Sequence, residues 1–191
     1  CTKVVPVNIK KTKTPNAGFS TFVGNVVTCL QIAGVDVPRK FDTWYRNARE
    51  MPLNITNSDV LPHDAISILG NKTLYALALY VSFQMAEFFG STVIAHKLEE
   101  FCHSPIFGIK KSQDLWIFGQ NERQISQRLG RLGVNLSYFE LQNKDILSQV
   151  FESIFFVQNL ILLLAEKRNR TELWFVEQRD ILKASSDTIY E

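Results

Sequence analysis

From residue 65 onward, short runs of β-branched and aromatic residues alternate with stretches whose apolar residues recur at helical spacing. We expect strands at Ala65–Leu69, Leu115–Phe118 and Leu136–Phe139, with helices between and after them. Such alternation favours a parallel sheet, because the crossover between two parallel strands needs a connection about the length of a helix. The sequence therefore predicts an α/β fold in which helices cover both faces of a parallel sheet, an αβα sandwich.

The first 50 residues predict a strand and two helices. The strand is Lys3–Ile9, the first helix is Phe19–Ala33 with Gly34 at its end, and the second helix follows Pro38. Residues 51–62 contain several residues that break regular structure, and we interpret them as a linker between two domains. The second helix has four apolar residues spaced for one face: Phe41, Trp44, Tyr45 and Ala48.

The composition is that of a globular chain, with 46% hydrophobic and 21% charged residues among 191. The longest apolar stretch, Ile154–Ala165, contains Gln158 and Asn159 and is shorter than the ~20 residues that a membrane-spanning helix needs. We therefore predict no membrane span. Three cysteines are too few for a disulfide framework, so we expect a reducing, cytoplasmic location.

The net charge of +2 offers little support for a nucleic-acid partner, and we predict none. The charge is unevenly distributed, because residues 1–51 hold eight basic and three acidic side chains. This segment therefore carries +5 and the rest of the chain −3. The basic segment is typical either of a solvated surface or of a site near a small anionic ligand.

The predicted helix Thr73–Phe89 is apolar on almost all sides and should be largely buried. Tyr80, Gln84 and Glu87 form one narrow polar stripe along it, which must face water or an internal site. A carboxylate among aromatic side chains has a raised pKa, which suits a general base near neutral pH. Glu87 is therefore a candidate base, or else an ordinary structural glutamate.

The segment His96–Pro105 contains two histidines, two glutamates and a cysteine. His96 with Glu100, and Glu99 with His103, have the spacing of ligand pairs on a helix, but the sequence supplies no third ligand and we predict no metal. His103 precedes Ser-Pro, where a helix must end, and is a candidate for proton transfer. We expect Cys102 to pack in the core.

The segment Gly70-Asn-Lys-Thr73 lies between the predicted strand Ala65–Leu69 and the predicted helix Thr73–Phe89. Its backbone N–H groups could bind a phosphate. The alternative is that Thr73 simply caps the N-terminus of the helix.

Several segments together resemble the sugar isomerase (SIS) family, in particular the isomerase half of glucosamine-6-phosphate synthase and the related phosphosugar deaminases. Gln84-Met-Ala-Glu87 is similar to a helical Lys-Leu-Lys-Glu segment of that family. Glu100-Phe-Cys-His103-Ser-Pro105 is similar to its Glu-Leu-Lys-His-Gly-Pro segment, and Glu87 and His103 keep the family's interval of sixteen residues. Phe155-Phe-Val-Gln-Asn-Leu160 resembles its Val-Pro-Leu-Gln-Leu-Leu helix, and Arg179-Asp-Ile-Leu-Lys183-Ala resembles its closing Arg-Asn-Leu-Ala-Lys-Ser tail.

At the other end, Ile9-Lys-Lys-Thr12-Lys13 resembles the Val-Ala-Ser-Thr-Lys segment that closes the family's first lobe over the sugar. The early Ser-x-Ser-Gly-x-Thr phosphate loop of that lobe has no counterpart here. The resemblance thus implies that residues 1–50 are the C-terminal part of a first SIS lobe, 51–62 a linker, and 63–191 a second SIS domain.

The resemblance also implies an activity: isomerisation or deamination of an aminohexose or ketohexose 6-phosphate through an enediol(amine), without metal or organic cofactor. Glu87 would move the proton between C1 and C2, and His103 would assist ring opening in a neighbouring subunit's site. Lys183 would form a Schiff base with the ketose or hold the open-chain sugar. Ile9, Thr12 and Lys13 would contact the substrate, and the chain would form a homodimer with shared sites.

Some positions differ from the family pattern, among them Gln84 and Ser104, which stand where the family has lysine and glycine. These differences keep an alternative open, a regulatory SIS protein that binds a sugar phosphate without turnover.

Overall fold

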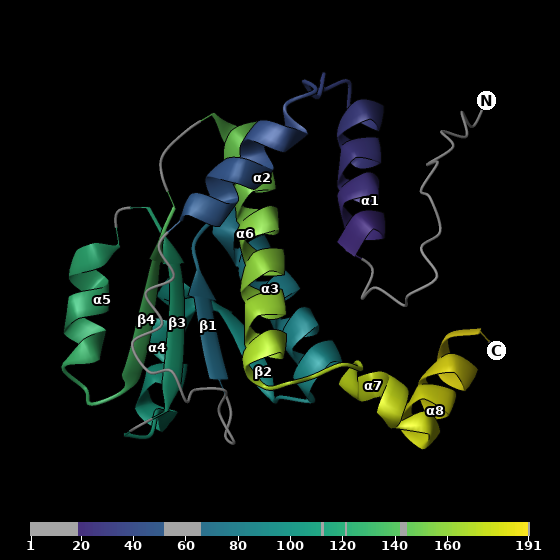
Figure 1. The fold of residues 1–191 in the computed structure, drawn as a ribbon. Helices are drawn as coiled ribbons and strands as arrows, with labels where there is room; N and C mark the ends of the chain where they lie inside the picture. Colours follow the sequence, from purple (N-terminus) through teal and green to yellow (C-terminus); the bar gives the residue numbers. More distant parts are fainter. Residues whose placement is uncertain (1–18, 52–65, 112, 121, 142–144, 191) are drawn as a thin grey trace.

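In the computed structural model, residues 19–51, 66–111, 113–120, 122–141 and 145–190 are described (Figure 1). Their core is a four-stranded parallel sheet of β1 (Ile66–Gly70), β2 (Val93–Lys97), β3 (Asp114–Gly119) and β4 (Asn135–Glu140). The strand order is β2-β1-β3-β4, so the chain moves outward from β1 to β2 and then crosses back to the other side of β1. The predicted parallel α/β sheet is confirmed.

Helices make the crossovers that parallel strands require. The connection from β1 to β2 is α3 (Thr73–Phe89), and the connection from β3 to β4 is α5 (Arg123–Gly130). Between β2 and β3 the chain forms α4 (Leu98–His103) and the 3-10 helix η1 (Pro105–Gly108). The long helix α6 (Ile146–Lys167) follows β4.

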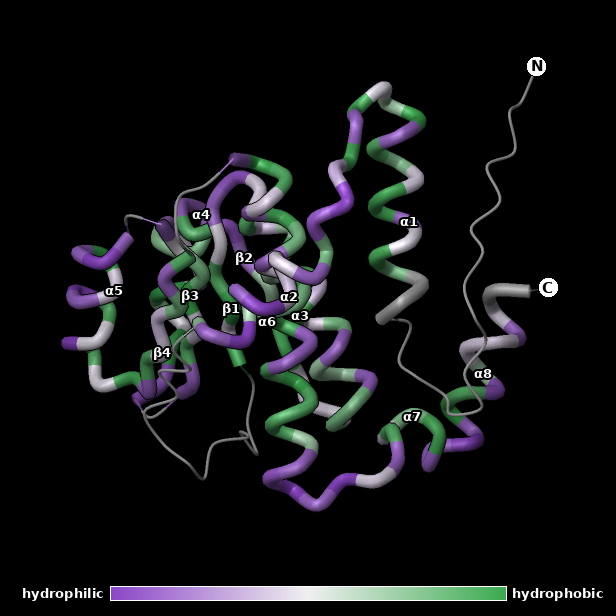
Figure 2. Tube along the Cα trace, turned by 45° about the horizontal axis from the view of Figure 1, so that its top comes forward, coloured by the Kyte–Doolittle hydropathy of each residue, from purple (hydrophilic) through white to green (hydrophobic). Residues whose placement is uncertain are grey.

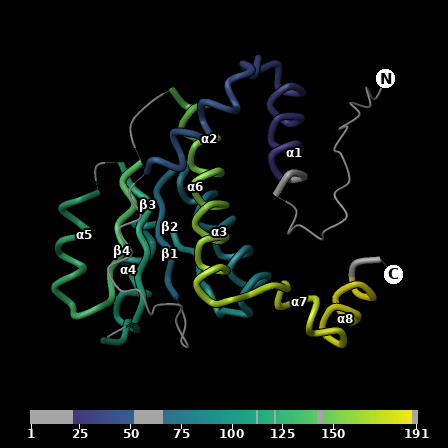
Figure 3. Tube along the Cα trace, in the orientation of Figure 1, coloured from purple at the N-terminus to yellow at the C-terminus, as the bar shows by residue number. Residues whose placement is uncertain are grey.

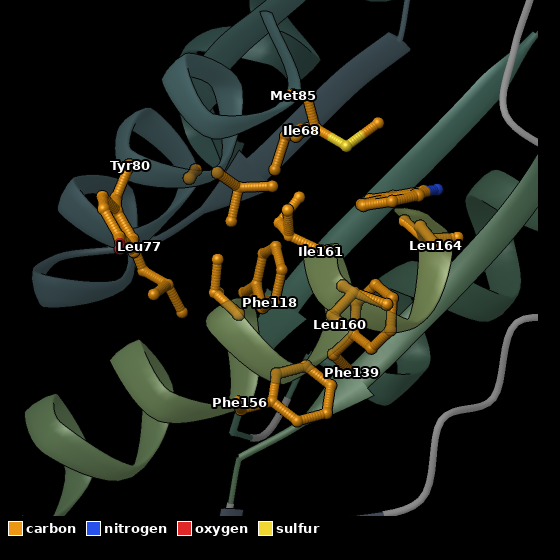
Figure 4. Packing of buried hydrophobic residues seen from close by; sticks show 14 of the residues in the cluster. Ile68, Leu77, Tyr80, Met85, Phe118, Phe139, Phe156, Leu160, Ile161 and Leu164 are labelled. Atoms are coloured by element: carbon orange, nitrogen blue, oxygen red, sulfur yellow. The ribbon is translucent and has the colours of Figure 1, made fainter. Parts of the chain in front are cut away.

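The two faces of the sheet bury separate hydrophobic clusters, because alternate residues of a strand point to opposite faces. One cluster joins Ile68 and Phe118 to side chains of α3 and α6, as Figure 4 shows. The other cluster joins Leu69 and Ile117 to residues of α4 and α5, among them Phe101. Helices therefore cover both faces, as the alternating pattern predicts. In Figure 2, α5 shows both purple and green stretches, as expected for a helix that buries one side.

The helix α2 (Phe41–Glu50) packs along α6. Trp44 is buried, stacks on the Phe151 ring at 4.7 Å between centroids, and donates a hydrogen bond from Nε1 to Ser148 Oγ at 2.8 Å. Asn47 Nδ2 donates to Glu152 Oε1 at 2.7 Å. These contacts attach α2 to the layer that covers one face of the sheet. The proposed linker lies almost wholly outside the described residues, so the division into two lobes stays a prediction.

Three helices lie outside the two layers (Figures 1 and 3). They are α1 (Phe19–Ile32), α7 (Trp174–Glu177) and α8 (Arg179–Tyr190). α1 meets the rest of the structure through α6 and through the Phe22 ring, which stacks on Tyr80 at 4.0 Å. α7 packs on α3, and α8 continues from α7.

The helix α6 is also long and apolar enough, by length and composition, to cross a membrane. Half of its most apolar window is buried inside the fold, including Phe156, Leu160 and Ile161 against the sheet (Figure 4). A buried core helix has this composition.

Several expectations need correction. The strand β2 was not among the predicted strands, and His96 lies in it, so His96 and Glu100 are not a pair on one helix. Thr73 is the first residue of α3, and Lys72 holds the N-cap position without a side-chain cap. Cys102, expected in the core, is exposed.

Candidate functional site

The polar stripe of α3 faces the interior of the helical layer. Tyr80 and Gln84 are buried, although both side chains carry polar groups. The Tyr80 hydroxyl accepts a hydrogen bond from Gln158 Nε2 of α6 at 3.2 Å, while its ring packs against Phe22. Burial raises the pKa of Tyr80 to about 12; the Gln158 hydrogen bond lowers it by a smaller amount, and the Glu87 charge adds to the increase. Tyr80 therefore stays a neutral hydroxyl at physiological pH.

Glu87 lies in the last turn of α3 and is half-buried. Gln84 Nε2 donates a hydrogen bond to Glu87 Oε2 at 3.2 Å. Burial raises the pKa of Glu87 above its ordinary value, and the hydrogen bond from Gln84 lowers it by a smaller amount. A carboxyl group with a raised pKa and one fixed oxygen can accept and return a proton, which is the chemistry of a general base.

The C-terminal end of α3 is where α7 attaches. Gly90 ends the helix with a left-handed φ of 65°, and the Trp174 ring of α7 packs so closely on it that an added Cβ would lie 2.4 Å from Trp174 Cε2. Arg170 Nη1 pairs with Glu177 Oε2 at 2.6 Å and closes the turn between α6 and α7. The exposed Lys183 follows on α8. The helix α7, which leads into α8, is thus anchored at the end of α3 that carries Glu87.

His103 lies at the exposed C-terminal end of α4. That helix belongs to the cluster on the other face of the sheet, so one chain does not bring His103 and Glu87 together. Phe101 and Leu98 are the residues that anchor α4 in the core. If the two side chains act together, His103 must act in a second copy of the chain.

Three further predicted site residues, Ile9, Thr12 and Lys13, lie outside the described residues. Among the residues that are described, no group of three or more His, Cys, Asp or Glu side chains is arranged to hold a metal ion.

A polar crevice lies at the carboxyl ends of β1 and β3. Of its lining residues, only those in Gly70–Thr73 were predicted from the sequence to face a ligand. The chain places β2 on one side of β1 and then β3 on the other side. In open α/β sheets, ligands bind at the point where the strand order reverses in this way. The crevice measures about 230 Å³ and is lined by Asn71, Lys72, Thr73, Leu74, Gln120, Glu122 and Gln149. Glu122 reaches into this crevice from the start of α5.

The carboxylate of Glu122 is held by neighbours from both strands. Gln120 donates its backbone N–H to Glu122 Oε2 at 2.6 Å, and Asn71 Nδ2 donates to Glu122 Oε1 at 3.4 Å. At Gly119, an added Cβ would lie 2.5 Å from Glu122 Oε2, so the glycine leaves the space for this carboxylate. The sequence signals were the strand-ending glycines, each followed by an amide side chain. The phosphate loop suggested by Gly70–Thr73 therefore faces a carboxylate of the chain itself.

An apolar cavity of about 220 Å³ lies between α1, α3 and α6. Phe22 and Val26 line it from α1, and Leu77 and Tyr80 line it from α3. The cavity adjoins the polar stripe at Tyr80, while Phe22, Val23 and Val26 of α1 pack against the hydrophobic core.

The fold is similar to known structures. The crystal structure of a glucosamine-6-phosphate deaminase from Thermotoga maritima matches with a TM-score of 0.51 at 17% identity, covering 78% of this chain and 51% of that chain. The likeness shows the fold. Candidate phosphosugar isomerases from Salmonella typhimurium and Bacillus subtilis match with TM-scores of 0.46 and 0.48, at 15% and 14% identity. They cover 82% and 81% of this chain, and 49% and 48% of their own chains.

The chain thus spans about half the length of these proteins. No protein-family model matches it, and no curated protein matches its sequence.

Proposed function

We propose that the chain is the catalytic-base half of a phosphosugar isomerase or deaminase of the SIS type, acting on a hexose or aminohexose 6-phosphate. The observation that carries this proposal is the half-buried Glu87, hydrogen-bonded to Gln84 on a buried polar stripe. The fold shared with a deaminase of that substrate class, and the residues that resemble the family, support it.

In the proposed reaction the Glu87 carboxylate removes the proton from C2 of the open-chain aldose. The electron pair moves into a C1–C2 double bond, and the C1 carbonyl oxygen takes up a proton to give an enediol, or an enediolamine from an aminosugar. Glu87 then returns the proton to C1 while the C2 heteroatom loses its own, which leaves the ketose or its imine. Water releases ammonia from the imine. General-base catalysis of this kind contributes ~10²–10⁴-fold to the rate.

Lys183 and His103 have supporting roles in this proposal. Lys183 holds the open-chain sugar or forms a Schiff base with its carbonyl, and His103 of a second copy assists ring opening. The protein therefore acts as a homodimer with shared sites. In this proposal it is cytoplasmic and needs neither metal nor organic cofactor. Substrate contacts from Ile9, Thr12 and Lys13 complete the proposed site.

The test is turnover of glucosamine 6-phosphate, followed as ammonia and fructose 6-phosphate, together with borohydride trapping of a lysine adduct. We expect product from the wild-type protein and a loss of about 100-fold or more in Glu87→Gln. Glu99→Gln, which changes an exposed glutamate on α4, is the matched control and should keep the wild-type rate. Binding of the sugar phosphate without product or adduct would instead support a regulatory binding protein.

A further inference from the structure

The polar crevice at the carboxyl ends of β1 and β3 has the lining of a small-molecule site that is separate from Glu87. Its volume of about 230 Å³ accommodates a ligand of several non-hydrogen atoms. It lies at the point of the sheet where ligands bind in open α/β folds. Four amide and carboxylate side chains line it: Asn71 after β1, Gln120 after β3, Glu122 at the start of α5 and Gln149 on α6.

One lining residue, Gln120, has a side-chain donor without a partner among the described residues. Gln120 Nε2 is shielded from solvent and has no hydrogen-bond partner within the described part of the chain. A buried donor without a partner costs free energy, and a ligand hydroxyl that accepts its hydrogen bond would remove that cost. The amide of Gln149 adds a further group that can hydrogen-bond a hydroxyl.

One carboxylate and one ammonium group line the crevice, those of Glu122 and Lys72. The Glu122 carboxylate, held by the Gln120 N–H and the Asn71 amide, stands beside the N-terminal end of α3, where an anion would otherwise be favoured. The Lys72 side chain is exposed. A phosphate entering the crevice would meet the carboxylate at close range, whereas an ammonium group would pair with it.

From this arrangement we infer that the crevice is a binding site for a small organic cation that carries hydroxyl groups, with Glu122 pairing with its ammonium and the amides of Gln120 and Gln149 binding its hydroxyls. This site goes beyond the proposed isomerase chemistry, because none of its residues belongs to the Glu87 stripe. On this inference, a sugar phosphate binds at a different place on the protein.

A matched pair of probes isolates the charge. Glycerol and 2-amino-1,3-propanediol differ only in the central group, which is a hydroxyl in the first and an ammonium in the second. In titrations followed by the side-chain amide NMR signals of Asn71, Gln120 and Gln149, we expect the aminodiol to bind about tenfold more tightly than glycerol. Inorganic phosphate at the same ionic strength should neither shift these signals nor displace the aminodiol.

Glu122→Gln keeps an oxygen that can accept the Gln120 N–H and should therefore preserve the fold, which an unchanged melting temperature would verify. In this variant the preference for the aminodiol should fall to about twofold or less, while Glu99→Gln and Glu87→Gln should retain it. Equal binding of the two probes to the wild-type protein, displacement by phosphate, or an unchanged preference in Glu122→Gln would overturn the inference. Failure of the Glu87 assay alone would leave these results unaffected.

Discussion

Gln84 Nε2 donates its hydrogen bond to Glu87 Oε2 at 3.2 Å, one turn along the same buried side of α3. This hydrogen bond favours the charged form of Glu87 and partly offsets the effect of burial on its pKa. Replacing Gln84 by methionine keeps the volume and removes the donor, so the pKa of Glu87 should rise further. Carboxyl ¹³C NMR titration measures this. A pKa in Gln84→Met equal to or below the wild-type value would contradict the assignment of the hydrogen bond.

Because burial raises the pKa of Glu87, the folded protein binds a proton to it more tightly than the unfolded chain does. Between the unfolded and folded pKa values, the folded state therefore loses stability as the pH rises. Glu87→Gln removes this loss. The melting temperature of the variant minus that of the wild-type protein should therefore increase as the pH rises between the two pKa values, and stay constant at higher pH. Glu99→Gln is the control. A difference that stays constant from pH 4 to pH 8 would show that the two states bind the proton equally.

Gly90 joins α3 to the strand β2 beneath the Trp174 ring, and Gly90→Ala should destabilise the protein by roughly 2–5 kcal/mol. About 1–2 kcal/mol comes from a side chain at left-handed φ and about 1–3 kcal/mol from overpacking against Trp174. Gly34 shares the positive φ but has open space around it, so Gly34→Ala isolates the backbone contribution. Gly108→Ala, which has neither feature, should change the free energy of unfolding by less than about 0.5 kcal/mol.

Urea unfolding of the three variants measures these differences. Equal effects of Gly90→Ala and Gly34→Ala would mean that Trp174 does not pack on Gly90. Because α7 leads into the helix of Lys183, displacement of Trp174 should also reduce the proposed activity.

Trp44 attaches α2 to α6, and Trp44→Phe should cost about 1–3 kcal/mol, because it removes buried area and the hydrogen bond to Ser148 Oγ. Ser148 still donates to Asp145 Oδ2, at 2.7 Å, which limits the loss. Tyr45→Phe changes a half-exposed ring on the same helix and is the matched control. Urea unfolding with an unchanged m-value should show the difference, and equal stabilities of the two variants would contradict the role given to Trp44.

The sequence predicted the main elements of the fold because their patterns are local. The apolar periodicity of Thr73–Phe89 matches α3 at both ends, and the three expected strands agree with β1, β3 and β4 to within one residue at each end. β2 was missed since it is an edge strand, half-exposed and ending in His96 and Lys97, so it lacks the buried apolar run that identified the others.

The candidate site was predictable only in part. The position of Glu87 on a helix with a polar stripe follows from spacing along one element. Partners from distant elements, such as Gln158 for Tyr80 and Trp174 for Gly90, depend on how helices pack and leave no pattern in the sequence. The crevice at Glu122 was missed for the same reason, because it forms only when the ends of β1 and β3 become neighbours.

Proton exchange at the sugar tests the central proposal most directly, because it reports the action of the base without requiring complete turnover. In D₂O the wild-type protein should incorporate deuterium at C1 of fructose 6-phosphate, detected by loss of the C1 proton NMR signal. Glu99→Gln should exchange at the wild-type rate, and Glu87→Gln about 100-fold or more slowly. Exchange that proceeds as fast in Glu87→Gln as in the wild-type protein, or no exchange in either, would contradict the assignment of Glu87 as the base.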